Sequence, residues 1–204
     1  MQPYPSDWSP DGRFLLYYEL NSKTKSDIWL LPDPGGAPGG QKPVPFLRSP
    51  FTESQGLFSP DGHWIAYSSD ESGPYEVYVR PFPPGPGKWK VSIGGGELPR
   101  WSRDGKELFY LSPEHSPTGS AAAGRTRKLM AAAVKAVPGA QPVFEPAVPQ
   151  ALFDVSVPAI MPGRNTYVYA VAADGKRFLV NTRVGDAAET PLTVVVNWLA
   201  AVKK

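Results

Sequence analysis

The sequence offers few side chains that could act as a catalytic base. It contains two histidines, His63 and His115, and no cysteine. A serine hydrolase needs a nucleophile beside a base, and in α/β-hydrolases that serine lies in a Gly-x-Ser-x-Gly turn, which this sequence lacks. His63 directly follows an Asp-Gly pair, and His115 lies in a segment rich in Pro, Ser and Gly, so both are expected to be loop residues. We therefore expect no catalytic residues and a protein that is not an enzyme.

Candidate ligands for metals and phosphates are equally sparse. Two distant histidines without cysteine do not form an ordinary zinc site. Asp70 and Glu71 could give oxygen ligands to calcium, but adjacent carboxylates of this kind more often form a solvated turn. The segment 85–88 is followed by Trp89 instead of Ser or Thr, and glycines 94–96 do not continue as a dinucleotide fingerprint. The sequence thus predicts no metal site and no cofactor.

The clearest pattern is a five-residue motif that recurs along the chain. It reads Trp-Ser-Pro-Asp-Gly at 8–12, Phe-Ser-Pro-Asp-Gly at 58–62, Trp-Ser-Arg-Asp-Gly at 101–105 and, worn, Val-Ala-Ala-Asp-Gly at 171–175. Pro presets φ for a type I turn, Asp accepts hydrogen bonds from nearby N–H groups, and Gly takes the left-handed conformation. Each copy therefore predicts a strand, a tight turn and a second strand. The structural residues of these turns are Asp11, Gly12, Asp61, Gly62, Asp104, Gly105, Asp174 and Gly175.

Short apolar runs after each turn predict further strands. Third strands are expected at 27–31, 75–79, 128–134 and 192–196, and fourth strands at 44–47, 89–93 and 151–154. Four-stranded units of roughly 40–50 residues are typical of β-propellers.

We therefore predict an all-β fold. It is a partial β-propeller of about four blades, each a four-stranded antiparallel meander, with the last blade incomplete. One domain spans 1–204, and its approximate blades are 1–50, 51–96, 97–154 and 155–204, with a loop insertion at 113–126.

Charge and hydropathy argue against two classes of partner. Twenty-one Lys and Arg residues face nineteen Asp and Glu, and a net charge of +2 is too balanced for a nucleic-acid footprint. The most apolar stretch, 192–202, is too short for a membrane span. We expect no nucleic acid and no membrane insertion of this chain.

The repeat resembles that of a known family. The motif at 8–12 with Ser-Asp-Ile-Trp at 26–29, and the motif at 58–62 with Tyr-Glu-Val-Tyr-Val at 75–79, resemble the TolB-type PD repeat, a relative of WD-repeat propellers. The ending 190–204 resembles the C-terminus of propellers fused to bacterial receptor-type Ser/Thr protein kinases. That resemblance implies a sensor or scaffold on the extracytoplasmic, periplasmic side. Propellers of this type usually have more blades, so the chain is expected to be a C-terminal fragment or a short gene derived from one.

The same repeat also fits a second class of protein. Prolyl-oligopeptidase-type serine peptidases carry an accessory propeller that gates a separate catalytic domain, which would be absent here. A kinase domain and a membrane span encoded upstream would support the first alternative. An α/β-hydrolase domain encoded downstream would support the second.

The meander predicts where binding residues lie. The Asp-Gly turns share one rim, and the loops that join second to third strands and blade to blade share the other. The loops at 21–26, 69–74, 94–97 and 113–126 belong to this second rim, and function tends to lie on such loops. The candidate residues for binding a protein partner or small ligand are Asp70, Glu71, Gly95 and Glu97.

An arc of blades leaves two sheet faces without a neighbour. The equivalent aromatics Trp8, Phe58 and Trp101 are expected to pack between blades instead of forming a ligand platform. Large uncovered apolar faces usually mark an interface, so we expect a homodimer that completes the propeller, or a marginally stable chain. The residues expected on the uncovered faces are Phe14, Leu16, Ile28, Leu30, Phe178, Val180 and Val194 or Val196.

Overall fold

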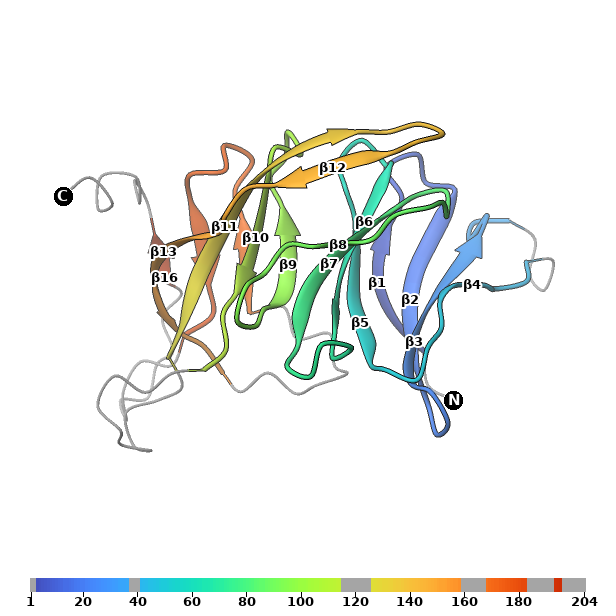
Figure 1. The fold of residues 1–204 in the computed structure, drawn as a ribbon, viewed down its shortest axis with the longest axis horizontal. Coiled ribbons are helices and arrows are strands. Elements are labelled where there is room, and N and C mark those ends of the chain that lie inside the picture. The colour runs from blue at the N-terminus through green and yellow to red at the C-terminus, as the bar shows by residue number, and fades with distance from the viewer. Residues whose placement is uncertain (1–2, 37–40, 115–125, 159–167, 183–192, 196–204) are drawn as a thin grey trace.

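The computed structural model describes residues 3–36, 41–114, 126–158, 168–182 and 193–195. These residues form sixteen strands in four antiparallel sheets and contain no helix. The sheets stand side by side in chain order, as propeller blades do (Figure 1). The predicted all-β, partial propeller fold is therefore confirmed. In the described part of the chain, no helix could span a lipid bilayer.

The first two blades are complete meanders whose strands pair in chain order. Their strands are β1 (Pro3–Trp8), β2 (Phe14–Asn21), β3 (Lys25–Pro32), β4 (Val44–Leu47), β5 (Glu53–Phe58), β6 (Trp64–Ser69), β7 (Glu76–Pro81) and β8 (Trp89–Lys90). β8 is shorter than the predicted 89–93. Beyond it, the hydroxyl of Ser92 accepts a hydrogen bond from the Val77 N–H at 2.7 Å, in place of a backbone carbonyl.

Blade 3 differs most from the expected meander. Its strands are β9 (Glu97–Trp101), β10 (Glu107–Leu111), β11 (Thr126–Val137), β12 (Val143–Pro146) and β13 (Gln150–Ser156). β11 extends past the predicted 128–134 and pairs with β13 through 126–131 and with β12 through 134–137. The outer strand is thus divided in two, and Pro146 and Pro149 lie at the division, since proline cannot donate to a ladder.

The far end of β11 forms a hairpin with β12 that leaves blade 3 and crosses blade 2 (Figure 1). Phe144 in β12 anchors this hairpin. Its ring centroid lies 5.2 Å from that of Trp64, 5.8 Å from that of Trp89 and 6.2 Å from that of Trp101. Aromatic pairs at such separations contribute about 0.5–1.5 kcal/mol beyond their buried area. The hairpin therefore fastens blade 3 to blade 2.

Blade 4 has the three strands β14 (Tyr169–Val171), β15 (Phe178–Val180) and β16 (Thr193–Val195), in that order. Its turn has Ala172 where the other copies have serine. The N–H of Gly175 still donates to the Ala172 carbonyl at 2.9 Å. The backbone turn is therefore retained without help from a serine side chain.

The apolar core lies between the blades. Each sheet has a leading face, which carries the residue three before the turn aspartate, and an opposite trailing face, because opposed residues of antiparallel strands share a face. At every described junction, the trailing face of one blade contacts the leading face of the next. The buried contacts are Leu16 and Ile28 against Ile65 and Tyr67, Trp64 and Val79 against Leu108 and Tyr110, and Phe109 and Leu129 against Phe178 and Val180.

Hydrogen bonds join the inner strands of consecutive blades. The Gln55 side-chain oxygen accepts from the Ser68 hydroxyl at 2.8 Å and from the Leu98 N–H at 2.9 Å. The Leu98 carbonyl accepts from the Tyr169 hydroxyl at 2.7 Å. All four residues are buried, so this chain of bonds fixes blades 2, 3 and 4 to one another.

Candidate interaction surface

The Asp-Gly turns form the upper rim of Figure 1. In the first turn, the Gly12 N–H donates to the Ser9 carbonyl at 2.8 Å, as in a type I turn. The Ser9 hydroxyl donates to Asp11 Oδ1 at 2.6 Å and accepts from the Phe14 N–H at 2.9 Å. The hydrogen bond from Ser9 holds the pKa of Asp11 below its usual value. The side chains thus support the turn and its exit strand.

The same geometry recurs in the later copies. Ser59 donates to Asp61, and Ser102 donates to Asp104 at 2.7 Å. The four turn glycines all lie in the left-handed region, which glycine adopts without strain. Their φ angles are 73°, 73°, 70° and 66° for Gly12, Gly62, Gly105 and Gly175.

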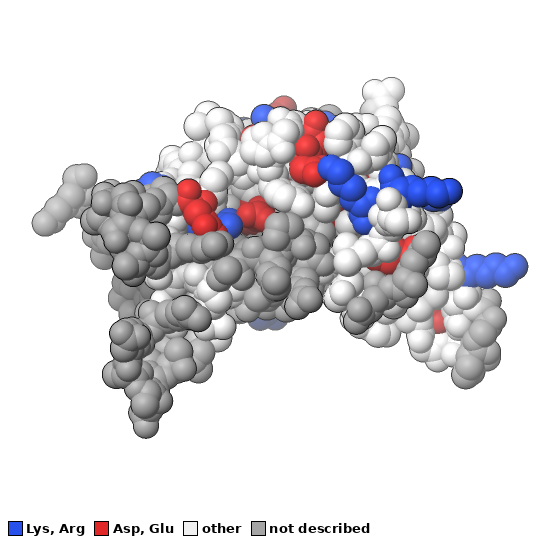
Figure 2. All heavy atoms as spheres, turned by 90° about the horizontal axis from the view of Figure 1, so that it is seen from below, with Lys and Arg blue, Asp and Glu red and all other residues white. Residues whose placement is uncertain are grey.

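Two of the predicted binding residues lie in the β6–β7 loop on the opposite rim. Asp70 accepts from the Thr52 N–H at 2.7 Å and from Lys25 Nζ at 2.8 Å. Burial opposes ionisation, but these hydrogen bonds hold the pKa of Asp70 below its usual value. Glu71 accepts from Lys88 Nζ at 2.6 Å. Acidic and basic side chains accordingly lie side by side on this rim (Figure 2).

The other two predicted residues lie between blades 2 and 3. Gly95 has a φ of 107°, and its N–H donates to Glu76 Oε2 at 3.1 Å. A Cβ at Gly95 would lie 2.3 Å from Pro113 Cγ. Glu97 accepts from Arg127 Nη1 at 2.8 Å, and both side chains are largely buried. The four residues therefore share a rim, but each makes an intramolecular contact and they do not line one open site.

The leading face of blade 1 has no described blade against it. Trp8, Leu15 and Leu31 lie opposite one another on β1, β2 and β3, and Tyr17 and Trp29 form the next row of that face. Trp8 is 52% exposed, and the other four side chains are partly exposed. This face presents three aromatic rings and two leucines to the outside of the arc.

The equivalent positions in the other blades show what such a face normally contacts. Trp8, Phe58 and Trp101 occupy the same place in their blades, and the sequence suggested that all three pack between blades. Phe58 is buried with the residues of blade 1, and Trp101 contacts Phe144. Trp8 is exposed because the described chain has no blade before it. In blade 2, the counterparts of Leu15, Tyr17 and Trp29 are buried, and they are Ile65, Tyr67 and Tyr78.

At the other end of the arc, no described blade covers the trailing face of blade 4. Leu179 is 42% exposed, and Ala170, which lies opposite it on β14, is also exposed. This face corresponds to the trailing faces of blades 1 to 3, which are covered by the next blade. The arc therefore ends in one leading face and one trailing face, which are of the kinds that contact each other at the internal junctions.

The prediction from the sequence of which residues lie on these uncovered faces was wrong. Leu16, Ile28 and Leu30 are buried under blade 2, and Phe178 and Val180 are buried against blade 3. Successive residues of a strand point to opposite faces, and in strands that are apolar on both faces the sequence does not tell which face has the neighbour. Phe14 packs edge-on against Phe82 of blade 2, with ring centroids 5.2 Å apart. The side chains of Val194 and Val196 lie outside the described residues.

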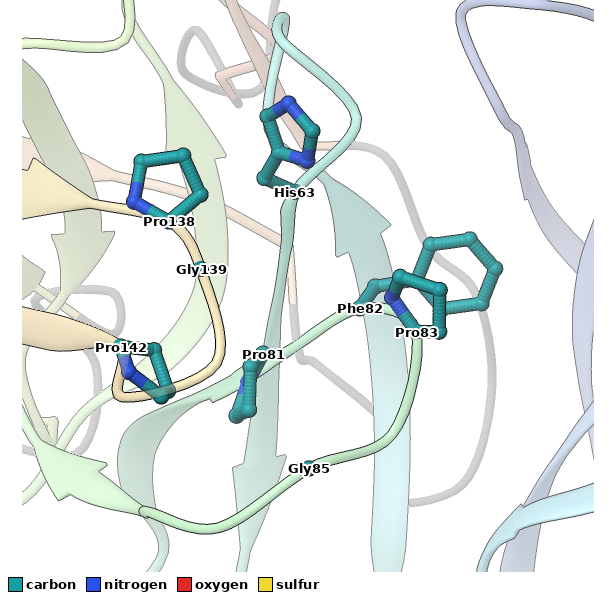
Figure 3. A pocket seen from close by; sticks show the side chains of 8 residues that line it. All are labelled: His63, Pro81, Phe82, Pro83, Gly85, Pro138, Gly139 and Pro142. Carbon is teal, nitrogen blue, oxygen red and sulfur yellow. The ribbon is translucent and has the colours of Figure 1, made fainter.

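A hollow of about 320 Å³ separates the β11–β12 hairpin from blade 2 (Figure 3). Pro138 and Pro142 of the hairpin face His63, Phe82 and Pro83 of blade 2 across it. The lining is mainly proline and aromatic, and it includes no serine, threonine or carboxylate that could act with the imidazole. The hollow is suited to an apolar group. The second histidine, His115, lies outside the described residues.

Two features of this surface could not be predicted from the sequence. One is the hairpin, whose proline-rich tip at 138–142 resembles any loop in the sequence. The other is a hollow of about 300 Å³ where β1, β5 and β9 end, lined by Trp8, Trp101 and Arg103. Asp7 lies at its edge, accepts from the Phe58 N–H at 2.9 Å and has a pKa raised by burial. The spacing of the repeats could have shown that these three strands end together, but not that their ends enclose a hollow.

No protein-family model matches this sequence, and no curated protein matches it. Solved structures are similar. A protein assigned as TolB from Agrobacterium tumefaciens is 18% identical with a TM-score of 0.54, over 76% of this chain and 50% of that one. The uncharacterized protein lmo1340 from Listeria monocytogenes is 12% identical with a TM-score of 0.51, over 98% of this chain and 52% of that one. The chain spans about half the length of each of these two structures. At such identities the similarity establishes the fold alone, and that fold is a partial β-propeller.

Proposed function

We propose that this chain is a non-catalytic β-propeller module that binds a protein or ligand and works as part of a larger propeller. The observation that carries the proposal is the uncovered leading face of blade 1. The counterparts of Trp8, Leu15, Tyr17 and Trp29 in blade 2 are all buried at the junction with blade 1. Contiguous apolar surface of this kind marks an interaction site more often than a free surface.

The surface that fits this face is the trailing face of another blade. A second copy of the chain provides one, since Ala170 and Leu179 of blade 4 could cover Trp8 and Leu15 of the first copy. A two-fold axis would make the two new junctions identical and would close the ring. Further blades of a longer polypeptide would supply the same kind of face.

We further propose that the larger protein is a bacterial receptor-type Ser/Thr kinase, with this module as its extracytoplasmic sensor or scaffold. The support is the resemblance of the ending 190–204, of which the structure describes only 193–195. The reading frame around the gene tests this part. A kinase domain and a membrane span upstream would support it, whereas a hydrolase domain downstream would favour a peptidase-gating propeller.

Assays of the purified chain test the absence of catalysis. We expect no turnover of peptide, ester, phosphoryl or glycoside substrates. His63 and Glu97 are the residues to substitute if activity is found, because one borders a hollow and the other lies on the predicted binding rim. Activity that persists through repurification and disappears in His63→Ala or Glu97→Gln would contradict the proposal.

A further inference from the structure

Two buried carboxylates at the junction of blades 1 and 2 each have an oxygen without a partner. Asp27 in β3 is 0% exposed, and Glu53 in β5 is 1% exposed. Asp27 Oδ1 and Glu53 Oε2 are buried and accept no hydrogen bond from any described residue. Burying a carboxylate oxygen without a partner is strongly unfavourable, so such a pair requires an explanation.

The backbone places these two side chains next to each other. Ser26 and Thr52 form a parallel bridge between the blades. The residues that follow them, Asp27 and Glu53, are therefore neighbours in register, and alternation points both side chains to the same side of the bridge. The Ser26 hydroxyl donates to the Glu53 carbonyl at 2.8 Å, which holds the two segments together.

The remaining oxygen of each carboxylate is fixed by a hydroxyl. Thr24 donates to Asp27 Oδ2 at 2.6 Å, and Ser49 donates to Glu53 Oε1. These bonds orient both carboxylates and leave Oδ1 and Oε2 free. Carboxylate oxygens together with hydroxyl and carbonyl oxygens are the ligands that hard divalent cations prefer.

The chain supplies little positive charge at this point. Arg48 Nε lies 3.7 Å from Asp27 Oδ2, and the Arg48 side chain is 53% exposed. Lys25, the neighbour of Ser26 in β3, forms its ion pair with Asp70 at 2.8 Å. Among the described residues, Glu53 makes no ion pair. The two negative charges are therefore opposed by one cationic side chain, Arg48, which is half-exposed.

The next junction also has two largely buried carboxylates. Glu76, at the start of β7, is the counterpart of Asp27. Glu97 lies at the start of β9, one position beyond the counterpart of Glu53. Arg127, which is buried, pairs with Glu97 at 2.8 Å, and Lys90 lies 3.5 Å from Glu76. The second junction thus has two cationic side chains, one of them buried, whereas the first junction has the half-exposed Arg48 beside Asp27.

We propose that a divalent cation of the calcium class binds between Asp27 and Glu53 and links blade 1 to blade 2. Its protein ligands are Asp27 Oδ1 and Glu53 Oε2, and water completes the coordination. Two carboxylate oxygens suit a hard cation that retains water better than they suit zinc, which takes three or four protein ligands. This site is independent of the proposed function.

Calorimetric titration of the full, metal-free chain with CaCl₂ tests the proposal. We expect a single site whose affinity falls at least tenfold in Asp27→Asn and in Glu53→Gln. Glu145→Gln is the control, because Glu145 is an exposed carboxylate on β12 and lies in another blade. It should bind calcium as the unchanged chain does. Absence of calcium binding, or equal binding by all variants, would overturn the site.

A second variant keeps the test decisive if the carboxylate variants fail to fold. Arg48→Gln alters a half-exposed side chain and retains both carboxylates. Removing the charge beside Asp27 should tighten calcium binding severalfold. Calcium should also raise the thermal midpoint of both this variant and the unchanged chain, because a ligand of the native state stabilises it. An unchanged affinity, or a midpoint that does not respond to calcium, would refute the proposal.

Discussion

Trp8 and Phe58 hold the same place in consecutive blades, three residues before the turn aspartate, yet Trp8 is 52% exposed and Phe58 is 5% exposed. The difference arises because blade 1 covers Phe58, whereas the described chain has no blade before Trp8. Phe58 thus lies in a contact between two blades, whereas the equivalent Trp8 lies on a face without that contact. Comparing substitutions at the two positions measures how much the contact stabilises the protein.

Truncating the two rings should have very different effects. Phe58→Ala should lower the free energy of unfolding by about 3–5 kcal/mol, since it removes a buried ring from a packed junction. Trp8→Ala should change it by about 0.5 kcal/mol when measured on dilute, monomeric protein. Urea unfolding followed by circular dichroism measures both. Equal losses would mean that Trp8 is covered in the isolated chain.

Two glycines with positive φ should both resist substitution. Gly62→Val should cost about 1–3 kcal/mol, because a β-branched residue is strained at a φ of 73°. From the sequence, Gly95 is expected to be the more tolerant position, since it lies in a run of glycines. In the structure, however, a Cβ at Gly95 would lie 2.3 Å from Pro113 Cγ. Gly95→Ala should therefore also lower the thermal midpoint.

Gly94→Ala is the control for Gly95→Ala. Gly94 has a φ of 75°, but no atom lies within 4 Å of the position a Cβ would take. Its substitution should cost less than that of Gly95. A larger shift of the midpoint in Gly94→Ala would contradict the proposed packing of this loop.

Phe144→Ala should detach the β11–β12 hairpin from blade 2. We expect a loss of about 3–5 kcal/mol in unfolding free energy, with faster hydrogen exchange in 134–146. Val148→Ala is a suitable control, because Val148 follows the same hairpin and is 76% exposed. Unchanged exchange in Phe144→Ala would show that the hairpin is held by other contacts.

Acid should weaken the turns. The hydrogen bond from Ser102, followed by that from the Lys106 N–H, holds the pKa of Asp104 below its usual 3.8. The ionised carboxylate therefore adds stability above pH 3.8, and this contribution is lost as the pH falls through the lowered pKa. In Asp104→Asn, the thermal midpoint should decline less steeply from pH 5 to pH 2. A decline as steep as that of the unchanged chain would contradict this role for Asp104.

The sequence predicted the turn residues better than it predicted which face of each sheet a neighbouring blade covers. Pro10, Asp11 and Gly12 determine their turn through bonds within a few residues, so the repeat was sufficient to place the strands. The burial of Leu16 instead of Leu15 depends on which side blade 2 occupies, and both faces of β2 are apolar. Likewise, Asp70 resembles a free surface carboxylate until the structure places Lys25 beside it.

The central claim is that this chain is an arc whose end faces require a partner. Size-exclusion chromatography with light scattering measures it most directly. We expect a dimer of twice the 22.1 kDa chain mass that dissociates in Trp8→Glu, because a buried, unpaired carboxylate would be placed in the new junction. A stable, monodisperse monomer at high concentration would contradict this expectation and would mean that the end faces need no partner.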